Sequence, residues 1–301
     1  MIGIKLPATS ANLGAGFDTL GVALSRYNYV WMEPATGIEV LSKDGTVIPT
    51  GEDNLVYRAV ARVYQLCGKP LDGLKIIQEN NIPMARGMGS SSACIAAGII
   101  GANELLGRPL TQVDLVDLAC AIEGHPDNTT PAILGGLTVS VVEDGRVYTA
   151  REQVSDRFCF VLLVPDFELK TERSRAALPE QYLRQDAVFN LSRSALMVTA
   201  LVQGNAENLR VAVQDRLHQP FRAELIPHCK EIFEITYRHG SLGTYISGAG
   251  PCVMAIVERE NTAYDNGVLR EMAQHGITGW KAERLLPDSV GAALLTEEEG
   301  R

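Results

Sequence analysis

A hinge of glycines and serines leads directly into an apolar stretch at residues 87–103, which read GMGSSSACIAAGIIGAN. Gly87 and Gly89 can adopt backbone angles that other residues avoid, so successive N–H groups can converge on one ligand. Residues 90–92, all serine, fall in the first turn of a predicted buried helix, where free N–H groups and the helix dipole favour an anion. Phosphate binding and ordinary serine capping after a turn explain this stretch about equally well, so other features must decide.

Two more loops of small residues separate predicted strands, PATSANLGAGFD at 7–18 and SGAGP at 247–251. Either loop alone is typical of an ordinary turn, but three such loops with these side chains favour a ligand-binding function. The patterns G-x-x-x-x-G-K-[ST] and G-x-G-x-x-G are absent, so neither common nucleotide-binding fold explains the hinge. The serine hydrolase pattern G-x-S-x-G is missing as well.

The chain has 301 residues, which is long for a single core, so we expect two domains at 1–155 and 156–301. Apolar residues make up 46% and charged residues 21%, which disfavours a disordered or fibrous chain. The sequence starts without the basic and apolar run of a secretory signal and contains no long uncharged apolar window. We therefore expect a cytoplasmic protein that makes no membrane contact.

The net charge of −9, without any basic run, disfavours nucleic acid as a partner, because binding a phosphate backbone needs clustered positive charge. An anionic ligand would instead be held by backbone amides, a helix end, a metal ion and a few arginines. The six cysteines are scattered and form no C-x-x-C pair, which disfavours a disulfide framework and a zinc site. The composition leaves a homodimer open.

Hydrophobic spacing and turn signals predict a mixture of strands and helices. The expected strands are 2–8, 22–33, 74–79, 137–142, 146–150, 158–165, 242–247 and 252–257. The expected helices are 55–67, 90–106, 112–123, 171–178, 186–203, 205–217 and 224–239. Thr111 and Asp114 predict a capping box at the start of the third of these helices.

Taken together, the three loops resemble the three motifs of the GHMP kinases, the family of galactokinase, homoserine kinase, mevalonate kinase and phosphomevalonate kinase. Residues 7–18 resemble the first motif in its homoserine kinase form, 87–93 the second, phosphate-binding motif, and 247–251 the third. The segments EGHPDN, KTERSR and HQPFR also resemble homoserine kinase segments. Small departures from the family pattern, which leave the expected chemistry unchanged, are Ala15, Met88 and Cys252.

The resemblance implies an α+β, two-domain fold: an N-terminal domain like ribosomal protein S5 domain 2 and a C-terminal ferredoxin-like domain, with the site in the cleft between them. The implied reaction transfers the γ-phosphoryl group of ATP to the side-chain hydroxyl of L-homoserine, in threonine biosynthesis. On the ATP side the resemblance places Asn54, Pro83, Arg86, Gly87, Met88, Gly89, Ser90, Ser91 and Ser92. On the amino-acid side it places Asn12, Asp18, His125, Asn128, Thr171, Arg175 and Arg222. The third-motif loop adds Ser247, Gly248, Ala249 and Gly250.

The chemistry of these side chains agrees with that division. Phosphoryl transfer needs a divalent cation, and Mg²⁺ prefers hard oxygen ligands, which Ser92 and Glu123 would supply. Arg175 and Arg222 offer forked donors for a carboxylate. Some relatives place a base beside the reacting hydroxyl, but the matching position here is Asn128, so we expect catalysis by positioning and electrostatics.

Three alternatives remain open at this point. One is another kinase of the same family, acting on threonine, mevalonate or a sugar. A second is a non-catalytic ligand sensor on the same scaffold, since a fold does not fix a function. The third is a serine amidohydrolase built on the GMGSSS run, which would need a basic group to activate serine. The nearest upstream candidate for that group is Lys75, which falls within a predicted strand.

Overall fold

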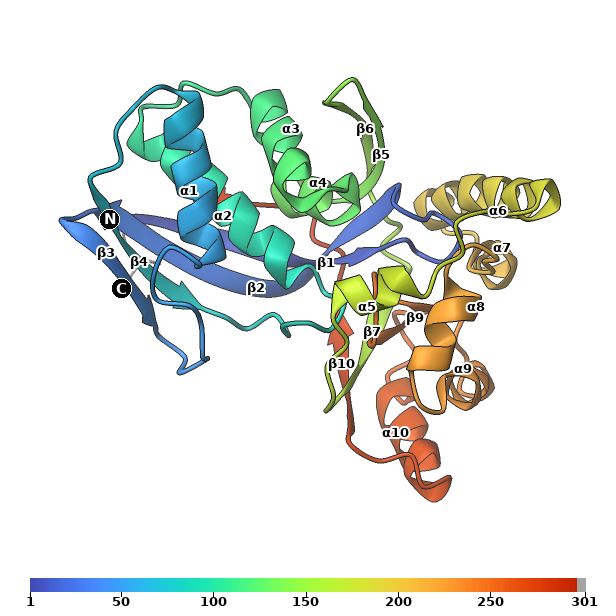
Figure 1. Cartoon of the computed structure of the whole chain (residues 1–301). Helices are drawn as coiled ribbons and strands as arrows, with labels where there is room; N and C mark the ends of the chain where they lie inside the picture. The colour runs from blue at the N-terminus through green and yellow to red at the C-terminus, as the bar shows by residue number, and fades with distance from the viewer. Residues whose placement is uncertain (297–301) are drawn as a thin grey trace.

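Two β-sheets with helices packed against them make up the computed structural model, which describes residues 1–296 (Figure 1). The strand order of the first sheet is β11-β1-β2-β4-β3, and β5 pairs with both β2 and β6. Its strands are β1 (Ile2–Ala11), β2 (Leu20–Pro34), β3 (Gly37–Ser42), β4 (Gly73–Glu79), β5 (Leu137–Glu143), β6 (Arg146–Glu152) and β11 (Ala293–Leu294).

Strand β2 organises the first sheet because it has 15 residues and pairs along its length. One edge of β2 carries β1, while the other carries β4 at residues 29–34 and β5 at residues 20–22. The register of β1 against β2 shifts between Pro7 and Ala8, because β2 bulges there with two residues, Ser25 and Arg26, that have no partner in β1. Beyond that bulge β1 continues to Ala11, so the first-motif loop shrinks to residues 12–19.

Four helices cover one face of the first sheet: α1 (Leu55–Leu66), α2 (Ser90–Leu105), α3 (Gln112–Glu123) and α4 (Pro126–Leu134). Helix α2 packs among α1, α3, α4 and β1, which explains why its sequence is apolar on most sides. A Cβ at Gly98 would lie 2.5 Å from the carbonyl oxygen of Val56, so glycine is what allows α1 and α2 to pack so closely. The predicted buried helix is confirmed.

The second sheet has the order β10-β7-β9-β8 and is antiparallel throughout. Its strands are β7 (Phe158–Pro165), β8 (Gly243–Ile246), β9 (Val253–Glu258) and β10 (Trp280–Leu285). Nearly all of β7 is buried, as its unbroken apolar sequence predicts. The remaining helices are α5 (Thr171–Ala176), α6 (Arg184–Gln203), α7 (Ala206–Ala212), α8 (Gln219–Arg222), α9 (Cys229–Arg238) and α10 (Tyr264–Gln274), with a 3₁₀ turn at Ala223–Leu225.

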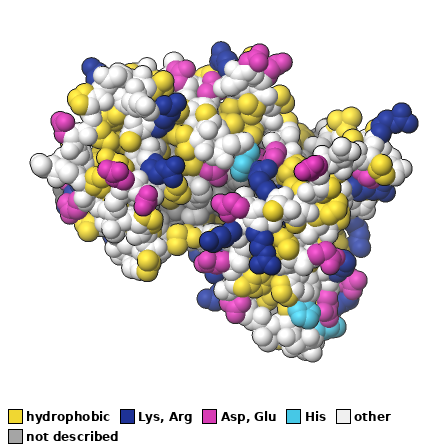
Figure 2. All heavy atoms as spheres, viewed as in Figure 1, with side chains coloured by type: hydrophobic (Ala, Val, Ile, Leu, Met, Phe, Trp, Pro, Cys, Tyr) yellow, Lys and Arg dark blue, Asp and Glu magenta, His cyan; other side chains and the backbone are white. Residues whose placement is uncertain are grey.

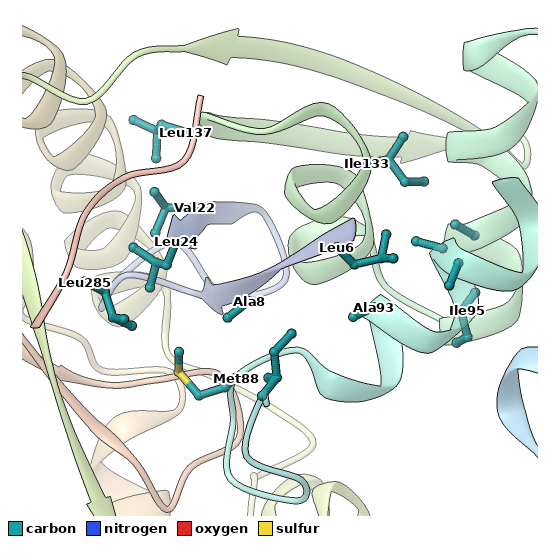
Figure 3. Close-up of a cluster of buried hydrophobic side chains, with 14 of the residues drawn as sticks. Leu6, Ala8, Val22, Leu24, Met88, Ala93, Ile95, Ile133, Leu137 and Leu285 are labelled. Atoms are coloured by element: carbon teal, nitrogen blue, oxygen red, sulfur yellow. The ribbon is translucent and has the colours of Figure 1, made fainter. Parts of the chain in front are cut away.

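The two sheets share one large apolar core. Met88, from the segment before α2, lies in the same buried cluster as Ala8, Leu24 and Leu285 (Figure 3). Because Leu285 belongs to β10 and Leu24 to β2, this cluster joins the second sheet to the first. After β10 the chain returns to the first sheet, where β11 pairs with β1.

Most predicted elements are confirmed, with shifts at their ends. The capping box at Thr111 and Asp114 is present, and the hairpin of β5 and β6 has its expected strands. The predicted helix 205–217 ends at Ala212, and 224–239 divides into the 3₁₀ turn and α9. The elements that the sequence did not reveal are β3, α4, α8, α10, β10 and β11.

The predicted domain boundary at residue 155 lies between β6 and β7, and it stays a prediction. The last five residues of the predicted second domain, 297–301, lie outside the described residues.

All six cysteines are free: Cys67 and Cys94 are partly exposed and the other four are buried. Among the helices of residues 1–296, none has both the length and the apolar character needed to cross a membrane.

Candidate active site

One cavity brings together loops that are far apart in the sequence. It is partly open to solvent, and the empty space in and above it is about 610 Å³. Acidic and basic side chains gather on this face, at the junction between the two parts of the molecule (Figure 2). The predicted residues that line it are Asn12, Asp18, Pro83, Arg86, Gly87, Met88, Gly89, Ser90, Ser91, Glu123, His125, Asn128, Thr171, Arg175, Arg222, Gly248 and Ala249. Ala85 and Asp127 line it too and were not among the predicted site residues.

The segment from Gly87 into α2 presents unused backbone donors. Gly89 is the N-cap of α2 in the left-handed conformation, at φ 68°, and no side chain caps this helix. Within residues 1–296, no hydrogen bond engages the N–H groups of residues 87–91. The side chain of Met88 is buried in the core, so its backbone is the part that faces the cavity. Free amides at a helix N-terminus can bind an anion, which is the role that the sequence predicts for this segment.

The third-motif loop supports this segment from behind. Ser247 donates its hydroxyl proton to the carbonyl oxygen of Gly87, at 2.6 Å. Because a hydroxyl has one proton, Ser10 must donate to Ser247, at 2.8 Å, and Tyr245 to Ser10, at 3.0 Å. Ser247 itself is fully buried, and of this loop only Gly248 and Ala249 line the cavity; Gly250 lies behind them, its N–H on the carbonyl of Ser247.

Glu123 ends α3 beside the first turn of α2. Its Oε1 accepts a hydrogen bond from Ser92 at 2.9 Å, and its Oε2 accepts one from Ser91 at 3.0 Å. The structure therefore brings together the predicted pair of Ser92 and Glu123 and adds Ser91 to it. A carboxylate and two hydroxyls are hard oxygen donors, and this donor set fits Mg²⁺.

The start of α4 contributes a chain of polar side chains. His125 Nδ1 lies 2.5 Å from Asp127 Oδ1, and Asn128 Nδ2 lies 3.5 Å from the same oxygen. Burial alone would lower the pKa of His125, but the hydrogen bond and the charge of Asp127 raise it above its usual value. Asn128 Oδ1 accepts a hydrogen bond from Thr9 Oγ1 at 2.8 Å.

Asp18 and Arg175 form a two-pronged ion pair across the cavity, with N···O distances of 2.8 and 3.1 Å. The hydrogen bonds that Arg175 donates to the Asp18 carboxylate raise the pKa of Arg175. Asn12 is engaged at both ends, because its Oδ1 accepts from the Asp18 N–H and its Nδ2 donates to the Gly248 carbonyl. Asn12 thus joins the first-motif loop to the third-motif loop.

Arg222 is a buried cation without a carboxylate partner among the described residues. It is 2% exposed, and its Nη1 donates to the Gly248 carbonyl at 2.9 Å and to His218 Nδ1 at 3.2 Å. Its Nε has no hydrogen-bond partner within residues 1–296. Burial and then the charge of Arg175 lower the pKa of Arg222 to about 10. Because this side chain lines the cavity, an anionic ligand there would neutralise it.

A second, mostly apolar hollow adjoins the first and shares Ala85, Ser90 and Ser91 with it. Asn54 lies in its wall, but its amide is already used. Its Oδ1 caps α1 and its Nδ2 donates to Gln78 and to the Pro49 carbonyl. The remaining residues of this hollow are Ile48, Leu55, Asn80, Met84 and Cys94.

Arg86 faces away from the free amides. Its guanidinium donates to the carbonyl oxygens of Met84, Pro165 and Asp166 and pairs with Glu168, so it connects the phosphate segment to the end of β7.

Asp127 was missed because helix α4 was not foreseen. Pro126 at the first helical position was the available signal, since proline favours that position.

The comparisons with known proteins agree with this geometry. The family model for the GHMP kinases N terminal domain matches residues 54–136, and the one for the GHMP kinases C terminal matches residues 197–278. A homoserine kinase of Desulfitobacterium hafniense is 43% identical over 298 residues, which cover 98% of this chain and 100% of that protein. The chain belongs to the GHMP kinases.

Within that family, its similarity to homoserine kinases extends over the whole length. The homoserine kinase of Clostridium acetobutylicum is 41% identical over 299 residues, which cover 98% of this chain and 100% of that protein. The crystal structure of homoserine kinase from Cytophaga hutchinsonii superposes with a TM-score of 0.86 at 24% identity, covering 98% and 97% of the two chains. The expected two-domain fold of the family is confirmed.

Proposed function

We propose that this protein is a homoserine kinase, which transfers the γ-phosphoryl group of ATP to the side-chain hydroxyl of L-homoserine. The product is O-phospho-L-homoserine, an intermediate of threonine biosynthesis. Full-length relatives at 41% and 43% identity are homoserine kinases. The single observation that carries the proposal is the polarity of one cavity: free backbone N–H groups line one wall, and the unpaired Arg222 lies with the Asp18–Arg175 pair on another.

ATP fits the two adjoining hollows. The free N–H groups of residues 87–91 offer donors for the phosphates, and the apolar hollow beside Ser90 and Ser91 suits a flat base. We assign Asn54 to the wall of the base site and not to a direct hydrogen bond, because its amide is saturated. Ala85 lies where the two hollows meet, and Pro83 lines the first of them.

We propose Mg²⁺ as the metal of this site, held by Glu123 and Ser92. The Ser92 hydroxyl donates to the Glu123 carboxylate at 2.9 Å, so the two oxygens lie close enough together to face one cation. When bound, the metal neutralises the phosphate oxygens during transfer. Ser91 is a further oxygen within reach of the same carboxylate.

The amino-acid side suits a zwitterion. Arg222 and Arg175 are donors for the substrate carboxylate, and Asp18 is an acceptor for its ammonium group. Asp18 and Arg175 neutralise each other, so a zwitterion would replace their one ion pair by two, one with each of these side chains. His125 and Thr171 complete this wall of the cavity.

Asn128 would orient the reacting hydroxyl. An amide cannot take up the hydroxyl proton, and a loose, metaphosphate-like transition state does not require a strong base, because the proton can leave late to a phosphate oxygen. The chain would thus contribute position and electrostatic stabilisation. Cytoplasmic location and homodimer formation stay predictions from the sequence.

A coupled ADP-release assay with Mg²⁺ and ATP tests the proposal. We expect turnover with L-homoserine that exceeds turnover with threonine, serine, mevalonate or galactose. Product analysis by phosphorus NMR should show a phosphate monoester on the side-chain oxygen. Preference for mevalonate or galactose would assign the chain to another GHMP kinase activity, and absence of turnover with every acceptor would favour a ligand sensor.

A further inference from the structure

Thr9 occupies a junction between the phosphate segment and α4. It lies in β1 beyond the bulge and is fully buried. Its backbone N–H donates to the carbonyl oxygen of Met88 at 3.2 Å, and its hydroxyl donates to Asn128 Oδ1 at 2.8 Å. One residue therefore contacts both the segment that faces the phosphates and the amide that faces the acceptor hydroxyl.

Gly89 packs directly on the same hydroxyl. A Cβ at Gly89 would lie 1.9 Å from Thr9 Oγ1 and 3.2 Å from Asn128 Oδ1. The N-cap of α2, the threonine hydroxyl and the asparagine amide are consequently in contact, without room for another atom between them. A shift of the Thr9 hydroxyl would be transmitted to both partners.

The orientation of the Asn128 amide follows from its neighbours. Its Nδ2 lies 3.5 Å from Asp127 Oδ1, so the opposite orientation would place two oxygen atoms side by side. With the nitrogen toward Asp127, Oδ1 is the end that accepts the Thr9 hydroxyl proton. One N–H of Nδ2 then points away from both partners and is available to the cavity that Asn128 lines.

We propose that Thr9 is a positioning residue that fixes the Asn128 amide so that it presents an N–H donor to the acceptor hydroxyl oxygen. This inference rests on the proposed function, and it adds a residue that makes no contact with either substrate. With Asn128 as the donor, the hydroxyl directs its own proton away from the amide and toward the transferred phosphoryl group. Thr9 also holds this donor in register with the phosphate segment through Met88 and Gly89.

Two variants isolate the hydroxyl group. Thr9→Ser and Thr9→Ala both lose the Cγ methyl group, so they differ only in the oxygen. We expect Thr9→Ala to lower kcat with homoserine by about 10-fold to 100-fold relative to Thr9→Ser, because misplacing a reacting group slows a reaction by a factor of that order. The KM for ATP should stay within about twofold, because the backbone N–H to the Met88 carbonyl is retained.

A double-mutant cycle separates a positioning role from a structural one. In an Asn128→Ala background, Thr9→Ala should cause no further loss of kcat relative to Thr9→Ser, since its partner is gone. A full loss in that background would overturn the proposal, as would equal kcat for the two Thr9 variants. A matched rise in the KM for ATP would overturn it too, because Thr9 would then act through the phosphate segment alone.

The melting temperature of each variant shows whether it is folded. If Thr9→Ala unfolds, Thr9→Val serves as a second variant without the hydroxyl group. Thr9→Val keeps the branched shape and should show the same loss of kcat; wild-type kcat in Thr9→Val would contradict the proposal. If the wild-type protein phosphorylated another acceptor, the proposed function would be wrong, but the same comparison with that acceptor would still test Thr9. The two failures are thus distinguishable.

Discussion

At the scale of single residues, the role of Glu123 gives the most direct test of the metal site. Glu123→Ala removes the carboxylate that faces Ser91 and Ser92. We expect kcat to fall by about 100-fold or more, as for the loss of a group that stabilises transition-state charge. Turnover is measured against Mg²⁺ concentration, with a thermal melt to confirm folding. Wild-type turnover of the variant at limiting Mg²⁺ would show that Glu123 does not bind the metal.

Arg222 gives the corresponding test of carboxylate recognition. Arg222→Met keeps the length of the side chain and removes a buried charge that lacks a carboxylate partner among residues 1–296. We expect the KM for homoserine to rise about 30-fold, which corresponds to about 2 kcal/mol for one lost charged contact, while the KM for ATP is unchanged. Arg173→Met is the control, because it removes an exposed arginine in α5. If Arg222→Met raised the KM for ATP as much as the KM for homoserine, the assignment of Arg222 to the substrate carboxylate would be wrong.

Motif residues such as Gly87 and Gly248 were predictable because their resemblance to family motifs is local in the sequence. Thr9 and Asp127 were not, because their roles depend on contacts with residues 119 positions away or on a helix that the pattern concealed. The resemblance placed Arg86 on the ATP side, yet its guanidinium donates to the Pro165 carbonyl in β7, since a resemblance gives a position in the chain and not the direction of a long side chain.

At the scale of elements, the start of α2 makes a prediction about glycine. Gly89→Ala places a Cβ 1.9 Å from Thr9 Oγ1 at a residue with φ 68°. We expect loss of nearly all kinase activity and a lower melting temperature, because both the clash and the backbone strain must be relieved. Gly68→Ala is the matched control, since Gly68 has φ 62° and open space around its Cα. Gly68→Ala measures the cost of placing a Cβ at a positive φ alone, which is about 1 kcal/mol. Equal effects of the two substitutions would mean that packing on Thr9 is unimportant.

The elements that the sequence revealed are those with strong local signals. Helix α1 has a capping asparagine and regular apolar spacing, and β7 is a continuous apolar run. Strand β3 was missed because it is short, begins with a glycine and buries only Val40 fully, while three of its six residues are exposed. Helix α4 contains Pro131 in its interior, which argued against a helix on propensity alone.

At the scale of the whole molecule, His218 links the two parts. Its Nε2 donates to the Gly14 carbonyl at 2.7 Å, and its Nδ1 accepts from Arg222 at 3.2 Å. Burial lowers the pKa of His218 below its unfolded value. The folded state therefore binds fewer protons than the unfolded state, so stability is complete above about pH 6.5 and is lost as the pH falls below it.

Urea unfolding at pH 7.5 and pH 5.5 measures this effect. We compare wild type with His218→Gln, which keeps a donor and an acceptor but does not titrate. Wild type should lose more stability on acidification, by at most about 1.4 kcal/mol per pH unit for one proton. The raised pKa of His125 changes stability with pH in the opposite direction, but both proteins contain His125, so its effect cancels in the comparison. The same pH dependence in both proteins would contradict the role of His218.

The sheet order was beyond what the sequence pattern could supply, since it depends on pairings between distant segments. The contact between β1 and β11 joins Ile4 to Leu294, and no local signal marks a two-residue strand. The second sheet likewise needs β10, whose alternation of charged and apolar residues was not distinctive. The family resemblance supplied the architecture that periodicity could not.

The pairing of β11 with β1 has a consequence for synthesis on the ribosome. During translation the outer edge of β1 emerges early, but its partner at Ala293–Leu294 emerges only after the second sheet has been made. An unpaired strand edge is a template for association with other chains. The nascent protein therefore carries an open edge through most of its elongation, and a chain that stalls late would expose it to its neighbours.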